Sequence, residues 1–538
     1  SRGTPWQFDV LIIGSGYGAS VAAARLAARL RPGYRLAVLE RGREWLPGTF
    51  PDRFPDVMAA SRLQLLGKKK GQVHDPTGLF DVRQFDEITT LAGSGLGGSS
   101  LINANVALRP DRDVFPLPDW PGPLRDRVAL DPYFDLAERE LGVASEPWDH
   151  TPKMIALRRA QEYLADSGAH YEPAALTITR GPQGALPLLN AQGLCQRPCI
   201  DCGDCLTGCN VGAKNTLAYN YLPLARRAGA ELYTQTEVHR VEKVDGYYRV
   251  HFTHHAKRAE GGYESYHGAT TTRILILGAG SLGSSEILLR SQAANLQLSP
   301  RLGCSWTGNG DALGFIRKSQ YPTGIGGLSA YPTERSRVGP TIQTNLTYPN
   351  RNLAGRVLIQ DGAAARAYAN ALGFLKRDLD LDQTLILLGM GHDGAAGHIS
   401  LDEHGYAQIS WPGLLESDYR KLIRGEFRRV AEAVGGEYEY LKIFGDRMIS
   451  VHPLGGCAMA ESPAYGVVNH QGQVFDGQFG GDASGPEGQA RVHSGLYVMD
   501  GAMLPTSIAC NPLLTITALA ERCAAHLVTD PQWSELFA

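Results

Sequence analysis

The chain has 538 residues, a formal net charge of −3 and a sequence pI of about 6.6, with acidic and basic residues mixed along its length. This balance lacks the basic character of a nucleic-acid-binding protein, and the length predicts two lobes around a large shared core. No apolar run approaches the ~18 residues that a membrane-spanning helix needs. We therefore expect a soluble protein without a nucleic-acid partner, and the sequence leaves its localisation open.

The first predicted element is a nucleotide-binding unit. An apolar strand at residues 8–13 leads into a glycine turn and then into an Ala/Leu/Arg-rich helix, which is the order of a βαβ unit. Gly14, Gly16 and Ala19 match the pattern G-x-G-x-x-[G/A], in which glycines allow a tight turn and the close approach of a pyrophosphate to the helix start. A second strand ends in Glu40, twenty-six residues after Gly14, and a carboxylate there suits a ribose diol. The unit predicts a dinucleotide but does not decide between NAD and FAD.

Four later segments narrow the choice. Residues 91–110 (LAGSGLGGSSLINANVALRP) are dense in Gly and Ser, and residues 273–291 repeat the order of strand, glycine turn and helix. HPLGGC (452–457) and an apolar stretch over residues 496–527 close the chain. In their order, and over nearly the whole chain, these motifs resemble the glucose-methanol-choline (GMC) family of FAD-dependent oxidoreductases, in its cholesterol-oxidase-like branch with non-covalent flavin. The match is weakest over residues 315–445.

The resemblance implies an α/β fold with two domains. A Rossmann-like FAD-binding domain would comprise residues 1–110, 191–314 and 446–538. A substrate-binding domain, residues 111–190 and 315–445, would cover the flavin with a mostly antiparallel sheet backed by helices.

The resemblance also implies which residues hold FAD. The Leu91–Pro110 segment contains no histidine for a covalent flavin link, so we expect the flavin to leave the protein on denaturation. The implied cofactor residues are Gly14, Gly16, Gly18 and Glu40 at the ADP half, Val238 at the adenine through its backbone, Gly98, Ser99 and Asn103 along the isoalloxazine, and Asp500 and Gly501 along the ribityl chain and pyrophosphate.

Alcohol oxidation needs a base for the hydroxyl proton while the carbinol hydride goes to flavin N5. Family likeness places His452 of HPLGGC against the flavin, and an imidazole titrates near neutral pH. Asn511 is the second candidate catalytic residue. Asn511-Pro512 also has the form of a helix N-cap followed by a first helical proline, so Asn511 is expected both to start a helix and to orient donors toward the substrate oxygen and the reduced flavin.

One departure from the cholesterol oxidases concerns a further active-site glutamate, which is linked to migration of the steroid double bond. Where its counterpart is expected, this chain has His392 and Asp393 but no glutamate. Asp393 is an alternative carboxylate, but Asp-Gly favours a turn. Isomerase activity is accordingly doubtful.

A cysteine-rich stretch carries five of the nine cysteines. Cys199, Cys202, Cys205 and Cys209 follow C-x₂-C-x₂-C-x₃-C, and Cys195 precedes them. The spacing is that of bacterial iron–sulfur ligands, and sugar dehydrogenases of the family carry a cluster in a comparable insertion. Disulfides or plain thiols are the alternative, and zinc is disfavoured because its ligands usually come as two separated pairs.

The family branch favours a secondary alcohol on an apolar, sterol- or terpenoid-like scaffold, with molecular oxygen, an electron-transfer protein or a quinone as acceptor. A sugar or polyol dehydrogenase that passes electrons through an iron–sulfur cluster is the alternative within enzymes. A non-catalytic flavin-binding protein is the alternative of another class, and the presence of both His452 and Asn511 argues against it. A polyol pocket needs several fixed polar groups, whereas a terpenoid pocket should be mostly apolar.

Overall fold

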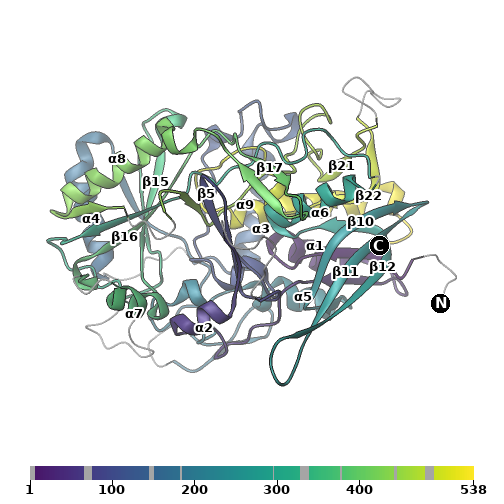
Figure 1. Cartoon of the computed structure of the whole chain (residues 1–538), viewed down its shortest axis with the longest axis horizontal. Helices are drawn as coiled ribbons and strands as arrows, with labels where there is room; N and C mark the ends of the chain where they lie inside the picture. Colours follow the sequence, from purple (N-terminus) through teal and green to yellow (C-terminus); the bar gives the residue numbers. More distant parts are fainter. Residues whose placement is uncertain are drawn as a thin grey trace.

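The computed structural model describes residues 6–65, 75–144, 151–181, 185–294, 296–326, 338–375, 379–440, 445–478 and 490–538. Two large sheets dominate it, and helices cover them (Figure 1). The α/β fold expected from the sequence is confirmed, with a Rossmann-like sheet and a second, antiparallel sheet. The boundaries of the two domains stay a prediction.

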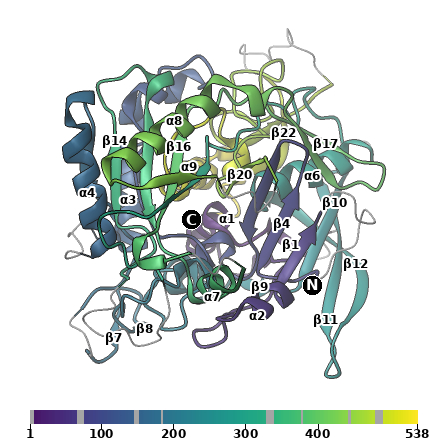
Figure 2. The same cartoon turned by 60° about the vertical axis from the view of Figure 1, so that its left-hand side comes forward.

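The described helices surround both sheets (Figures 1 and 2). Among the described residues, none of them combines the length and apolar character needed to cross a bilayer. The helices are α1 (Tyr17–Arg29), α2 (Phe54–Ala59), α3 (Asp131–Leu141), α4 (Pro152–Leu164), α5 (Tyr221–Arg227), α6 (Gly280–Gln292), α7 (Arg366–Leu375), α8 (Asp418–Ala433) and α9 (Leu513–Thr529).

The eight-stranded sheet contains the nucleotide-binding unit. Its strand order is β10-β11-β12-β1-β2-β9, and β22 pairs with both β12 and β21. Strands β12, β1, β2 and β9 run parallel, as does β22 beside β12, whereas β10, β11 and β12 form an antiparallel meander. The strands are β1 (Phe8–Ile13), β2 (Leu36–Leu39), β9 (Glu231–Tyr233), β10 (Thr236–Val244), β11 (Tyr247–Lys257), β12 (Tyr263–Leu277), β21 (Gln473–Phe475) and β22 (Val492–Val498).

The six-stranded sheet is antiparallel, in the order β19-β13-β16-β15-β14-β6. One of its faces packs with α4 and α8 in a separate hydrophobic core that contains Leu346, Ile359 and Leu387. The opposite face turns Leu358 and Met390 into the core of the nucleotide-binding lobe. The strands are β6 (His170–Pro173), β13 (Ala312–Arg317), β14 (Thr344–Thr347), β15 (Val357–Gly362), β16 (Leu385–Gly391) and β19 (Glu437–Glu439).

Smaller sheets complete the fold. A four-stranded sheet has the order β20-β5-β4-β3, and two hairpins, β7 with β8 and β17 with β18, stand apart. The strands are β3 (Ser61–Gln64), β4 (Phe80–Gln84), β5 (Ile88–Gly93), β7 (Leu188–Leu189), β8 (Cys195–Gln196), β17 (His398–Leu401), β18 (Ala407–Ser410) and β20 (Met448–Ser450).

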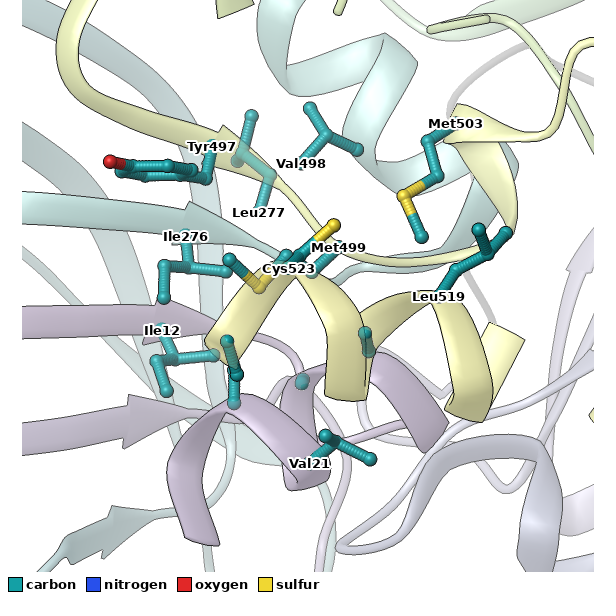
Figure 3. Close-up of a cluster of buried hydrophobic side chains, with 14 of the residues drawn as sticks. Ile12, Val21, Ile276, Leu277, Tyr497, Val498, Met499, Met503, Leu519 and Cys523 are labelled. Atoms are coloured by element: carbon teal, nitrogen blue, oxygen red, sulfur yellow. The ribbon is translucent and has the colours of Figure 1, made fainter. Parts of the chain in front are cut away.

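The end of the chain packs into the beginning. Figure 3 shows side chains of α9 meeting those of β1, α1, β12 and β22 in one buried cluster. Small residues permit this approach: a Cβ on Gly18 would stand 1.7 Å from the carbonyl oxygen of Met499, so only glycine fits there. The fold therefore brings the residues after Met499 next to the glycine turn of the first βαβ unit.

A half-buried histidine at this junction, His470, predicts acid sensitivity. Burial and the neighbouring Arg522 lower the pKa of His470 to about 4, and Arg522 Nη2 donates to His470 Nδ1 at 3.0 Å. An unfolded histidine titrates near 6.5, so as the pH falls from about 6.5 to about 4 the unfolded chain takes up a proton that the folded chain refuses. His470 thus lowers the free energy of unfolding over this window. In His470→Gln the melting temperature should fall less between pH 7 and pH 4 than in the parent, as measured by calorimetry; equal pH slopes would contradict the assignment.

Candidate active site

The glycine turn leaves open space at one position. A Cβ on Gly14, whose φ is +90°, would meet the carbonyl oxygen of Gly278 at 2.3 Å, whereas a Cβ on Gly16 would meet nothing within 4 Å. A Cβ on Gly98 would lie 2.8 Å from the Cα of Gly16. The Gly/Ser-dense segment therefore lies against the fingerprint, and the space beside Gly16 is what a pyrophosphate needs.

Glu40 lies directly after β2 and is buried. Its Oε2 accepts from Ser15 Oγ at 2.7 Å, and its Oε1 accepts from the N–H groups of Gly42 at 2.8 Å and Gly95 at 3.2 Å. Burial raises the pKa of Glu40, and these donors oppose that rise. Ser15 also accepts from the N–H of Gly97 at 3.0 Å, so it ties three segments together. Ser15 was not predicted as part of the site, although it stands between Gly14 and Gly16 of the fingerprint.

Asp500 connects the second glycine turn to the end of the chain. Its Oδ2 accepts from the N–H of Gly280 at 2.8 Å and from Ser284 Oγ at 2.5 Å, and its Oδ1 accepts from the N–H of Ala502 at 2.7 Å. Burial raises the pKa of this carboxyl to about 6. The carbonyl oxygen of Gly501 accepts from the N–H of Gly455 at 2.9 Å, which places the HPLGGC segment beside it.

The remaining predicted flavin residues lie on two separate segments. Asn103 donates from Nδ2 to Tyr17 Oη at 2.7 Å, while its buried Oδ1 has no partner among the described residues. Ser99 Oγ accepts from the N–H of Gly93 at 2.9 Å. Val238 lies in β10 at an irregularity of the ladder with β11. Its neighbours Glu237 and His239 line a cavity of about 450 Å³.

The open space beside Gly16 and the unpartnered Asn103 oxygen fit a bound dinucleotide. Both features lie on segments that contact each other. The predicted cofactor residues are thus compatible with FAD, and each contact with it remains a prediction.

His452 is paired with a buried carboxylate. Its Nδ1 lies 2.9 Å from Asp311 Oδ1, and Asp311 Oδ2 accepts from the N–H groups of Val451 at 2.7 Å and His452 at 2.9 Å. The side chain of Asp311 is 1% exposed and that of His452 is 14% exposed. A carboxylate that accepts from several N–H groups also accepts from Nδ1, so the proton of a neutral His452 stays on Nδ1. This leaves Nε2 with a free lone pair.

Asn511 is held from the antiparallel sheet. Its Oδ1 accepts from Nε2 of Gln360, in β15, at 2.9 Å. The expectation that Asn511 is the N-cap of the last helix is wrong: α9 begins at Leu513, Pro512 occupies the cap, and no side chain caps this end. The physical reason is that the side-chain Oδ1 of Asn511, which would have accepted from a helix N–H, accepts from Gln360 instead.

One short glycine-rich stretch, residues 307–311 (TGNGD), positions both candidate catalytic residues. Asp311 holds His452, and Asn309 accepts from the N–H groups of Ile508 at 2.9 Å and Ala509 at 3.0 Å while donating to the carbonyl oxygen of Cys510 at 2.8 Å. Backbone bonds in both directions also join Thr307 to Leu454. This stretch was not predicted as part of the site, although Gly-Asn-Gly followed by Asp is a loop signal.

Asp393 anchors this stretch. Its two oxygens accept from Thr307 Oγ1 at 2.6 and 2.7 Å, from the N–H of Gly310 at 2.9 Å and from the N–H of Ala395 at 3.1 Å. The turn-forming role is therefore the one observed. Burial lowers the pKa of the neighbouring His392 to about 4.

The cysteines of the cysteine-rich stretch are free thiols in the structure. All nine cysteines are free, and the described residues, which include all nine, contain no group of three or more His, Cys, Asp or Glu side chains able to hold a metal ion. Burial raises the pKa of Cys199 well above its usual value and also raises that of Cys202. The iron–sulfur interpretation of Cys199, Cys202, Cys205 and Cys209 stays a prediction.

Comparison with known proteins agrees with this geometry. A family model described as GMC oxidoreductase matches residues 8–169 and 195–307, and the C-terminal model of the same family matches residues 484–520. A cholesterol oxidase from Acinetobacter baumannii is 28% identical over 97% of this chain and 94% of its own length. A long-chain-alcohol oxidase from Arabidopsis thaliana is 23% identical over 97% of this chain and 68% of its own, and a paromamine 6'-oxidase from Streptomyces fradiae is 25% identical over 97% and 92%.

A solved structure, pyridoxine 4-oxidase from Mesorbium loti, superposes with a TM-score of 0.61 over 97% of this chain and 99% of its own, at 17% identity, and so supports the fold. The fold and the matched models define an FAD-dependent oxidoreductase that acts on alcohols. The chain belongs to the GMC oxidoreductase family, which confirms the resemblance seen in the sequence.

The space at Gly16 gives a direct test of the cofactor site. In Gly16→Val, the added side chain meets no protein atom at Cβ but occupies the space assigned to the pyrophosphate, so we expect at least a tenfold rise in the FAD dissociation constant with little change in the folded apoprotein. Gly425→Ala, in α8, is the control because its Cβ also has open space. Flavin fluorescence titration measures both. Normal FAD affinity in Gly16→Val would contradict the assignment.

Proposed function

We propose that the protein oxidises a secondary alcohol on an apolar, sterol- or terpenoid-like scaffold, with His452 as the base. The observation that carries the proposal is the pairing of His452 with Asp311, because it leaves Nε2 able to accept the hydroxyl proton. General-base catalysis of this kind contributes roughly 10²- to 10⁴-fold.

When bound, FAD supplies the acceptor for the carbinol hydride. His452 takes the hydroxyl proton on Nε2 as the carbonyl forms, and Asp311 stabilises the imidazolium through the Nδ1 hydrogen bond. Asn511, beside the start of α9, offers its side-chain amide to the substrate oxygen. Gly14, Gly16, Gly18, Glu40, Asp500 and Gly501 would hold the ribityl and ADP parts of the cofactor, Val238 the adenine, and Gly98, Ser99 and Asn103 the ring system.

Partly exposed aliphatic side chains support an apolar substrate. In β16, Leu388 lies directly opposite Gln360 in register, so both project from the same face of the sheet. Leu313 of β13 is opposite Leu388, and Ile386 lies two residues before it on the same side. All three aliphatic side chains are only partly buried. Since Gln360 contacts Asn511, this face of the sheet borders the candidate catalytic residues.

We further propose that molecular oxygen is the acceptor. The relatives named above are oxidases, and among the described residues no group of three or more His, Cys, Asp or Glu side chains is placed to hold a metal ion. The alternative sugar dehydrogenase with a cluster is therefore less well supported. Iron and acid-labile sulfide assays on freshly isolated protein test this choice, since a stoichiometric cluster would overturn it.

The substrate class is tested by anaerobic bleaching of the flavin. A panel of sterols, terpene alcohols, sugars and aminoglycosides is mixed with the flavin-loaded protein. We expect sterols or terpene alcohols to bleach it and readmitted air to restore the absorbance with formation of one hydrogen peroxide per turnover. Bleaching by sugars or aminoglycosides alone would refute the apolar scaffold, and no bleaching by any member would favour a non-catalytic flavin protein.

A further inference from the structure

A row of polar side chains crosses the antiparallel sheet toward Asn511. Glu172 of β6 lies opposite Asn345 of β14, and Asn345 lies opposite Gln360 of β15, so the three share one face. Asn345 and Gln360 are completely buried, and Asn511 is nearly so. Buried amides in a row must satisfy their hydrogen-bond donors and acceptors with one another, because they have no access to bulk water.

Each hydrogen bond in this row has a defined direction, and Gln360 donates to both of its neighbours. Asn345 Nδ2 donates to Glu172 Oε1 at 3.4 Å, so its oxygen faces Gln360. Gln360 Nε2 then donates to Asn345 Oδ1 at 2.8 Å and to Asn511 Oδ1 at 2.9 Å. The carboxylate of Glu172, at the outer end of the row, can only accept hydrogen bonds. It therefore fixes which side of each amide donates, because every carboxamide has one donor side and one acceptor side.

The direction decides what Asn511 presents to a substrate. With Oδ1 of Asn511 engaged, its NH₂ group is left over, and among the described residues none accepts a hydrogen bond from it. If the side-chain amide of Gln360 alone were flipped, its oxygen would face the side-chain oxygens of both Asn345 and Asn511. The Oε1 atom of Gln360 is itself buried without a described partner, a rare arrangement in proteins.

We propose that Gln360 is a positioning residue that turns the NH₂ group of Asn511 toward the oxygen of the alcohol. This inference rests on the proposed function. An oriented donor stabilises the negative charge that develops on the substrate oxygen as its proton leaves. If the amide of Asn511 were turned the other way, its oxygen would face that negative charge and destabilise it. The amide Gln360 thus acts on catalysis through Asn511, without touching the reacting atoms.

The test is a double-mutant cycle with Gln360→Met and Asn511→Ala in the flavin-loaded protein. Cholesterol in detergent micelles and cyclohexanol serve as sterol and simple secondary alcohols, and anaerobic stopped flow gives the rate of flavin reduction. We expect Gln360→Met to lower that rate 10- to 50-fold in the parent and less than 2-fold in the Asn511→Ala background. Equal factors in both backgrounds would overturn the inference, because Gln360 would then not act through Asn511.

Two further measurements distinguish a failure of the positioning role of Gln360 from a failure of the catalytic role proposed for Asn511. If Asn511→Ala reduces flavin at the parental rate, the catalytic role of Asn511 is wrong and the proposed function loses that part. Independently of any substrate, the losses in melting temperature of the two single variants should sum to more than that of the double variant; simple additivity would overturn the contact itself.

A control and a second variant protect the test against misfolding. Gln343→Met removes another buried glutamine, whose Oε1 accepts from Thr151 Oγ1 at 2.7 Å, and should lower stability but change flavin reduction less than 2-fold. In Gln360→Glu, an ionised carboxylate cannot donate to Asn511, whereas a protonated one can. The rate relative to the parent should therefore rise as the pH falls; a ratio independent of pH would count against the positioning role.

Discussion

Replacing His452 with glutamine should lower the rate of anaerobic flavin reduction by roughly 10²- to 10⁴-fold, the usual contribution of a general base. Glutamine keeps the backbone N–H that donates to Asp311 Oδ2 at 2.9 Å, so the local fold should persist. Glutamine has no nitrogen that accepts a proton near neutral pH, and the hydroxyl proton would have to leave to water. Stopped-flow spectroscopy at saturating alcohol measures the change.

The effect of His452→Gln on substrate binding is as informative as the size of its loss in rate. The proposed base acts in the transition state, so the apparent dissociation constant of the alcohol should change by less than about 3-fold in His452→Gln. His404→Gln is the control, since this imidazole is 50% exposed and on the β17–β18 hairpin. A His452→Gln enzyme that keeps the parental rate would remove the proposed base.

The nucleotide-binding unit could be predicted because its determinants are local. A strand, a glycine turn and a small-residue helix follow one another within residues 8–29, and the observed β1 and α1 match that order. Glu40 and Asp500 were likewise marked by short motifs. Local signals of this kind can be read from a single sequence, because the turn itself requires glycine and other small residues.

The residues that orient the catalytic pair could not be predicted in the same way. Asp311 meets His452 across 141 residues of sequence, and Gln360 meets Asn511 across 151. Nothing in the sequence near either partner signals such a contact, because it arises from the packing of segments that are distant in the sequence. The helix-cap interpretation of Asn511 failed for the same reason, since a distant amide competes successfully with the local backbone.

The second large effect is expected from Asp311→Asn, which should lower the rate of flavin reduction about 10²-fold. A misplaced catalytic group typically costs that much. Asp311 Oδ2 accepts from the N–H groups of Val451 and His452, so the single oxygen of an asparagine would occupy that position. Its NH₂ group would then face His452 Nδ1 and force that nitrogen to accept. The neutral imidazole would carry its proton on Nε2, where it can donate to the alcohol but cannot take its proton.

Asp393→Asn is the matched control for this prediction. It places the same chemical change on a buried carboxylate that holds the same stretch, through Thr307 and Gly310, without contacting His452. Both variants should lose stability, because each leaves a buried donor poorly matched. Only Asp311→Asn should also lose about 10²-fold in rate and shift the pH profile of flavin reduction. Equal losses of rate in the two variants would mean that Asp311 matters through loop stability, and an unchanged rate in Asp311→Asn would show that the Nδ1 hydrogen bond does not select the reactive tautomer.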